Sequence, residues 1–120
     1  MRNRLKLPVL CTMVLAASTL QAQDVELGNT KFQHSCAPCH GKGPGDDGRA
    51  LLPGTDALRV KYQGSQPALL EERTDLPADV LMVYLRKGSW SMPPFRKTEL
   101  SDSEIRDIAA YLEFASSQSR

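Results

Sequence analysis

The run Cys36-Ala37-Pro38-Cys39-His40 limits the possible folds of this chain more than any other stretch does. Two thiols separated by two residues can each add to one of the two vinyl groups on a haem edge. The imidazole of the next residue then lies where it can reach the iron. The motif therefore predicts one covalent haem c, attached through Cys36 and Cys39, with His40 as the first axial ligand.

Three other interpretations of this motif are a thioredoxin-like dithiol, a zinc site and an accidental match. A thioredoxin-like motif lies beside a strand in a βαβ pattern, which the sequence lacks. A structural zinc site needs a second pair of ligands, which this chain does not possess. Haem attachment in an exported, helical domain is the interpretation that these features favour.

The other face of the iron needs a second ligand, and the candidates are Met92, Met82 and His34. Met82 falls within a helical run, where a methionine is more often a flexible core filler. His34 is only two residues from Cys36, so it is poorly placed to cross to the far face. Met92 lies in an extended segment stiffened by two prolines, which holds a weak thioether ligand at a fixed position. We therefore expect His40 and Met92 to be the iron ligands, against the alternative that Met92 only covers the haem edge.

The first 22 residues have the pattern of a secretory signal peptide. Arg2, Arg4 and Lys6 form a basic start, and residues 7–20 are an apolar run too short to span a bilayer comfortably. A cut after Ala22 would leave a domain of residues 23–120, exported to the periplasm. Cys11 lacks the small residue directly before it that a lipoprotein signal needs, so we expect no lipid anchor.

Removal of this segment takes three of the fifteen lysine and arginine residues and none of the fourteen acids, which leaves a formal charge of −2. Nucleic acids and anionic membrane surfaces bind concentrated basic faces, so neither is an expected partner. The remaining domain, on the order of a hundred residues, has a marginal core. It keeps only two cysteines, too close in sequence to link distant parts of the chain. A covalently attached cofactor would supply the missing apolar surface.

No strand-like alternation lasts long enough to build a sheet, so the predicted fold is all-α, with about four to five helices around one haem. Proline at a helix start, glycine at a stop and apolar residues at helical spacing identify the individual elements. Pro53-Gly54 is expected to form a turn before the second helix. The expected helical ranges are 25–35, 56–63 (capped by Thr55 and ended by Gly64), 67–73, 77–87 (ended by Gly88) and a last helix after Ser101.

The last helix has the clearest pattern. Ser101 and Glu104 form a capping box. The apolar stripe behind it buries one face, and its members are Ile105, Ile108, Ala109 and Leu112, with Tyr111 beside them.

Further residues are candidates for contact with the haem. A ligating histidine usually donates its second ring nitrogen to a backbone carbonyl, for which Pro53 and Pro44 are the candidates. Indole, phenol and guanidinium groups can satisfy a partly buried propionate. The candidates of these kinds are Trp90, Tyr62, Arg59 and Arg73. The alternative for the aromatic residues is packing, and for the arginines a solvated surface charge.

The motif CAPCH, the segment MPPF some fifty residues later, GNTKF before it and ELSDSEIRDIAAYL at the end resemble class I cytochrome c. The resemblance covers nearly all of the chain after residue 22. It implies that the first and last helices cross at close range, with Gly28 and Phe32 meeting Tyr111. It also implies a proline carbonyl about a dozen residues after the histidine, which favours Pro53, although Pro53 follows leucine here where the family usually has glycine.

Two stretches, PALLEERTDL and MPPFRKTELSD, are similar to the small cytochrome subunits of flavin-dependent oxidases of para-alkylphenols, such as p-cresol methylhydroxylase and eugenol hydroxylase. This resemblance implies a flavoprotein dehydrogenase or hydroxylase as electron donor. A soluble copper protein or another cytochrome would be the acceptor.

Histidine and methionine ligands together leave no open iron site for oxygen or peroxide, which favours electron transfer over catalysis. We therefore expect no catalytic residues and a non-enzymatic electron carrier. The alternatives are a free shuttle in a respiratory chain and a haem enzyme or gas sensor with an open axial site.

Overall fold

The computed structural model describes residues 22–120, so the predicted signal peptide lies outside the described residues apart from Ala22. Within this range the elements are all helical, and the only strand-like pairing is an isolated bridge between Ser89 and Met92. The predicted all-α fold is confirmed. The elements are α1 (Val25–Ser35), α2 (Ala37–His40), α3 (Pro53–Tyr62), the 3₁₀ helix η1 (Leu70–Glu72), α4 (Ala78–Lys87) and α5 (Asp102–Gln118).

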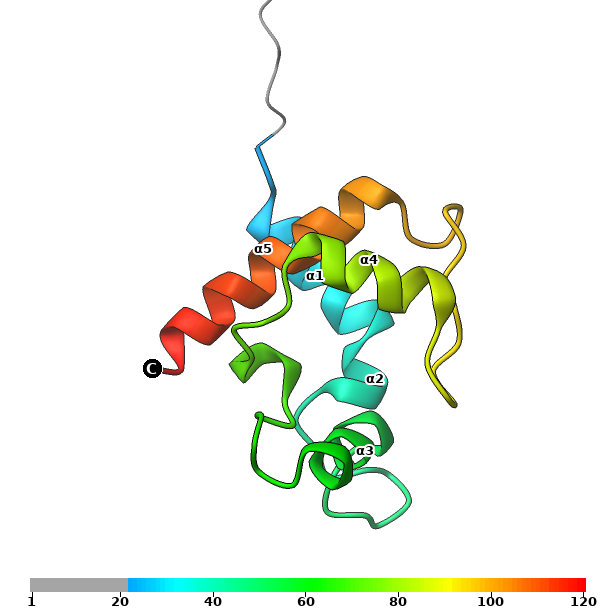
Figure 1. Cartoon of the computed structure of the whole chain (residues 1–120), viewed down its shortest axis with the longest axis vertical. Coiled ribbons are helices and arrows are strands. Elements are labelled where there is room, and N and C mark those ends of the chain that lie inside the picture. The colour runs from blue at the N-terminus through cyan, green and yellow to red at the C-terminus, as the bar shows by residue number, and fades with distance from the viewer. Residues whose placement is uncertain (1–21) are drawn as a thin grey trace, which may run out of the picture.

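The first and last long helices cross at close range (Figure 1). The carboxylate of Asp24 caps α1 by accepting from the backbone N–H groups of Glu26 and Leu27, each at 3.0 Å. One turn further on, Gly28 lies against the backbone of α5. The rings of Phe32 and Tyr111 meet with centroids 5.4 Å apart. The predicted crossing and its residues are confirmed.

The start of α5 has the predicted capping box. Ser101 Oγ accepts from the backbone N–H of Glu104, and the Glu104 carboxylate accepts from the N–H of Ser101 at 2.7 Å. Beyond the cap, the predicted apolar stripe of α5 is buried, and α4 packs against the same helix. The buried apolar core consists of Phe32, Cys36, Leu81, Leu85, Leu100, Ile105, Ile108, Ala109, Tyr111 and Leu112.

Tyr111 also links the crossing to η1. Its hydroxyl donates to the Glu71 carboxylate and lies 3.5 Å from the Gln33 amide nitrogen. Burial, with the nearby Glu71 charge, raises the pKa of Tyr111 to about 12. The hydroxyl therefore stays a donor at neutral pH. Within residues 22–120, no helix has both the length and the apolar character needed to cross a membrane.

Two helix predictions need correction. The helix predicted at 56–63 is α3. It begins at Pro53, three residues before the predicted start, and its C-cap is Gln63 in a left-handed conformation with φ 48°. Thr55 is not a cap: it is buried, and its hydroxyl donates to the Gly41 carbonyl at 3.1 Å. The predicted helix at 67–73 contains only the single turn of η1.

Candidate haem site

The Cys-x-x-Cys-His motif forms one helical turn. Cys36 is the N-cap of α2, and its carbonyl accepts from the N–H groups of Cys39 at 3.1 Å and His40 at 2.8 Å. Residues three apart in a helical turn lie on the same face, with Cβ atoms about 5–6 Å apart. Both cysteines are free thiols, with Cys36 buried and Cys39 exposed. Their placement suits two bonds to one edge of a flat cofactor.

Burial keeps the side chains of Cys36 and His40 uncharged. It raises the pKa of Cys36 to about 11, with a further contribution from the neighbouring Cys39. Burial also lowers the pKa of His40, so its imidazole is neutral at neutral pH. A neutral imidazole is the form that ligates a metal.

The His40 ring packs closely against the start of α3. Its Nδ1 is buried and has no hydrogen-bond partner among the described residues. Gly54 lies directly against the ring, because a Cβ built there would come within 2.7 Å of the His40 Cε1 and 2.8 Å of Nδ1. A side chain at this position would displace the imidazole, so the position requires glycine. The prediction of a turn at Pro53-Gly54 did not include this requirement.

The predicted hydrogen bond from His40 to a proline carbonyl is not formed, either with Pro53 or with Pro44. Pro53 is the first residue of α3, and the residue after it, Gly54, lies against the His40 ring.

The predicted second ligand, Met92, lies in the segment between α4 and α5. Ser89 and Met92 exchange two backbone hydrogen bonds of 3.0 and 2.9 Å around a tight turn. Gly88 ends α4 with φ 70°, and a Cβ there would come within 2.6 Å of the Met92 carbonyl oxygen. Met92 is partly buried against the core. This segment is non-helical and tightly held, as the sequence predicts.

The other two candidate ligands lie elsewhere. Met82 is part of α4 and packs against the core, in agreement with its interpretation as a core filler. His34 is exposed in the last turn of α1.

Two of the four candidates for propionate contact lie together. The Arg73 guanidinium lies 4.7 Å from the centre of the Tyr62 ring and is only 7% exposed, so it is not a solvated surface charge. It donates to both carboxylate oxygens of Asp75, at 2.8 and 2.6 Å. This ion pair lowers the pKa of Asp75, and the neighbouring Arg73 guanidinium lowers the pKa of Tyr62. Sequence reasoning missed Asp75, because its importance depends on the burial of Arg73, which the sequence does not show.

The other two candidates are apart from this cluster. Arg59 pairs with Asp56 at 2.7 Å in an exposed position on α3, as expected for a surface charge. Trp90 is fully exposed, with φ 54° at the turn before Met92, so no described residue covers its indole.

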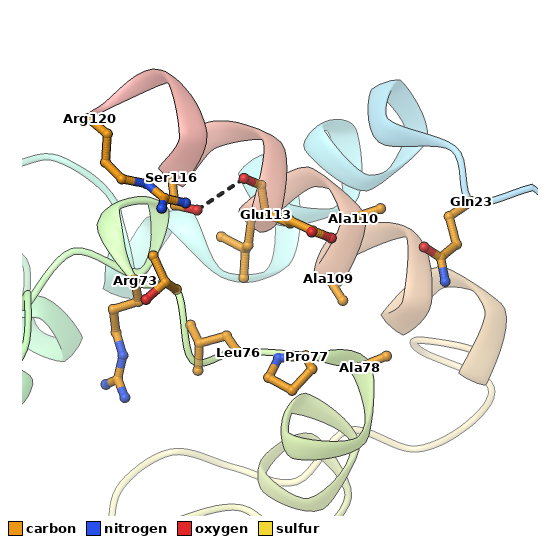
Figure 2. A pocket seen from close by; sticks show the side chains of 12 residues that line it. Gln23, Arg73, Leu76, Pro77, Ala78, Ala109, Ala110, Glu113, Ser116 and Arg120 are labelled. Atoms are coloured by element: carbon orange, nitrogen blue, oxygen red, sulfur yellow. Dashed lines mark hydrogen bonds between the residues drawn. The ribbon is translucent and has the colours of Figure 1, made fainter.

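An open groove of about 400 Å³ lies between α5 and residues 73–78 (Figure 2). Neither the cysteines nor His40 or Met92 line it. Arg73 lines the groove, and Figure 2 shows its side chain extending away from Glu113. The groove therefore borders the candidate haem site only at this candidate for propionate contact.

The donor set fits a haem and does not fit a structural zinc ion. Among the described residues, no group of three or more His, Cys, Asp or Glu side chains is arranged to hold a metal ion. Two free thiols on one face, a neutral imidazole beside them and a thioether on a stiff segment are the groups that a haem c requires. Cys36, Cys39, His40 and Met92 would hold it.

A helical domain with this turn at its centre defines a c-type cytochrome, which carries electrons with a haem. The chain belongs to the family described as cytochrome c oxidase, cbb3-type, subunit III, whose model matches residues 23–112. The match agrees with the resemblance to class I cytochromes. No curated protein gives a significant match to the chain.

Proposed function

We propose that this chain is a periplasmic single-electron carrier with one haem c bonded through Cys36 and Cys39 and its iron held by His40 and Met92. The observation that carries the proposal is the α2 turn. It puts both thiols on one face and a neutral imidazole, with a buried and unpartnered Nδ1, at the next position. When bound, the haem supplies a one-electron couple between ferric and ferrous iron.

The residues around the site favour electron transfer over catalysis. Met92 is held between Gly88 and the two prolines that follow it, so the thioether needs little ordering to occupy the sixth position. A thioether ligand and an apolar pocket both favour ferrous iron and raise the reduction potential. A raised potential suits a carrier that accepts electrons from a flavin.

The periplasmic location rests on the signal-peptide pattern of residues 1–22. The family match begins at residue 23, directly after the proposed cut. Haem c attachment and export in one chain are mutually consistent.

Replacing Met92 with alanine tests the axial assignment. The wild-type protein is expected to show the weak absorption band of a methionine sulfur bound to ferric iron, and its reduced form should not bind carbon monoxide at neutral pH. Met92→Ala should lose the band entirely and bind carbon monoxide. Met82→Leu, which changes the core methionine of α4, is the matched control and should keep the band. A wild-type protein without the band would overturn the assignment and favour a catalytic or sensing haem.

We infer that the electron donor is a flavoprotein dehydrogenase or hydroxylase acting on para-alkylphenols. The support is the similarity of PALLEERTDL and MPPFRKTELSD to the cytochrome subunits of such enzymes. The net charge of −2 after removal of residues 1–22 suits a basic docking surface on the partner. A soluble copper protein or cytochrome would then accept the electrons.

A second candidate is a free carrier in a respiratory chain. It is favoured by the family description, which names a subunit of a terminal oxidase. This candidate shares the haem site and differs only in the partners.

Purification of the tagged protein from the periplasm separates the two candidates. A flavoprotein subunit should co-purify, and addition of 4-methylphenol to the oxidised complex should reduce the haem. The purified cytochrome alone should stay oxidised under the same treatment. Recovery of the cytochrome without a flavoprotein, and without reduction by the phenol, would instead favour the respiratory shuttle.

A further inference from the structure

One arginine of α4 connects that helix to both ends of the segment that follows Met92. Arg86 donates from Nη1 to the Phe95 carbonyl at 3.0 Å and from Nη2 to the Leu100 carbonyl at 2.8 Å. Nη2 also donates to the Asp102 carboxylate at 2.5 Å. The Arg86 side chain is 20% exposed, and its Nε is buried with no partner among the described residues. The guanidinium is thus fixed by three acceptors on residues 95–102.

These acceptors are the anchor points of the segment that carries Met92. Phe95 lies three residues after Met92, and its N–H also bonds to the Leu85 carbonyl at 2.7 Å. Leu100 is fully buried, and Asp102 is the first residue of α5. Between these points, residues 96–99 form only an exposed turn closed by Arg96 and Glu99. Arg86 is therefore the side chain that fixes both ends of this turn to α4.

We propose that Arg86 is a positioning residue that holds the Met92 thioether at the iron. The inference rests on the proposed role of Met92 as axial ligand. Charge-assisted hydrogen bonds to carbonyls in a partly buried site such as this one each favour the ordered state by about tenfold. Loss of the guanidinium leaves the carbonyls of Phe95 and Leu100 without this donor and frees the end of the Met92 segment.

Arginine is suited to this role by its shape. A planar guanidinium can donate from two nitrogens to the carbonyls of two residues that are not neighbours in sequence, here Phe95 and Leu100. A lysine ammonium is a point charge on a flexible stem. Arg86→Lys keeps the charge opposite Asp102 but cannot reproduce all three bonds. The positioning role of Arg86 therefore requires the shape of the guanidinium as well as its positive charge.

Binding of imidazole to the ferric protein measures how often the methionine position is open. When a ligand binds only the open form, its apparent dissociation constant is the intrinsic constant divided by the open fraction. A tenfold larger open fraction thus lowers the apparent dissociation constant tenfold. The experiment uses the haem-loaded protein at neutral pH.

The variants are Arg86→Met and a matched control, Arg96→Met. Arg96 lies in the same segment and carries the same charge, but it is 79% exposed and pairs only with Glu99 at 3.3 Å. Arg86→Met should bind imidazole about tenfold more tightly than wild type and show a weaker sulfur-to-iron band. Arg96→Met should match wild type in both properties. Arg86→Lys should fall between Arg86→Met and wild type, and it carries the test against Arg96→Lys if Arg86→Met yields no haem protein.

The outcomes distinguish this proposal from the proposed function. An intact band in wild type with equal imidazole binding by the Arg86 and Arg96 variants would overturn the positioning role and leave the Met92 assignment standing. A wild-type protein without the band would overturn the Met92 assignment, and the role of Arg86 with it.

Discussion

Replacing Gly28 with alanine is expected to destabilise the folded protein strongly and to lower the urea concentration at which half of it unfolds. The added Cβ would lie 2.0 Å from the Asp107 carbonyl oxygen, 2.4 Å from its carbon and 3.0 Å from the Ile108 nitrogen. All three are backbone atoms of α5, so no rotamer change relieves the contact. The helices must move apart by about 1 Å, and closely packed interiors do not absorb such a shift cheaply.

The separation would weaken two contacts beside the crossing. The Asp24 N–H donates to the Asp107 carboxylate at 2.9 Å, and Phe32 packs on Tyr111. Alanine is normally the better helix former by about 1 kcal/mol. The backbone clash outweighs this gain. We expect the free energy of unfolding to fall by about 3 kcal/mol or more, from a total of about 5–15 kcal/mol.

Urea unfolding of the haem-loaded protein, followed by circular dichroism, measures this loss. Asn29→Ala is the matched control, because it changes the next residue of α1 on its exposed side. The control should unfold near the wild-type midpoint. A Gly28→Ala protein with an unchanged midpoint would show that the helices do not cross as closely as described.

The elements that depend on local chemistry could be predicted from the sequence. The predicted range 25–35 agrees with α1, in which Phe32 and Gly28, one turn before it, are buried. The cap supplied by Asp24 was not predicted. The capping box of α5 is likewise local, with both partners three residues apart. Such signals need no knowledge of the rest of the fold.

The start of α3 could not be predicted because long-range contacts decide it. Thr55 looks like a cap in the sequence, but its hydroxyl is used by the Gly41 carbonyl, fourteen residues earlier. Gly54 is needed against the His40 ring, so Pro53-Gly54 begins a helix where the sequence indicated a turn. The contact of Gly54 with His40 therefore outweighs the local preference of Pro53-Gly54 for a turn.

In the candidate site, too, local features could be predicted from the sequence and long-range contacts could not. The two thiols and the imidazole lie within five consecutive residues, so the motif alone identifies these groups, although the helical turn α2 that holds them was not predicted. The pairing of Arg73 with Tyr62 joins residues eleven positions apart through a largely irregular segment, and Asp75 binds the same guanidinium. No periodic pattern encodes that arrangement.

A protein in which both Cys36 and Cys39 are alanine is expected to retain no haem after denaturation in detergent. Thioether bonds survive denaturation, whereas axial bonds from the proposed ligands His40 and Met92 would not survive unfolding of the segments that hold them. The two thiols are on one face of a single turn, so each can form one bond to the same cofactor edge. Either single variant should therefore retain some haem through the remaining thiol.

Haem-stained denaturing gels of the exported protein measure the attachment. Cys11→Ala is the matched control, because Cys11 belongs to the predicted signal peptide and should leave the haem signal at the wild-type level. The double variant should also accumulate poorly, since a domain on the order of a hundred residues has a marginal core without the cofactor. Haem that stays with the denatured double variant would overturn attachment through this motif. Equal loss in Cys11→Ala would instead place a required thiol outside the α2 turn.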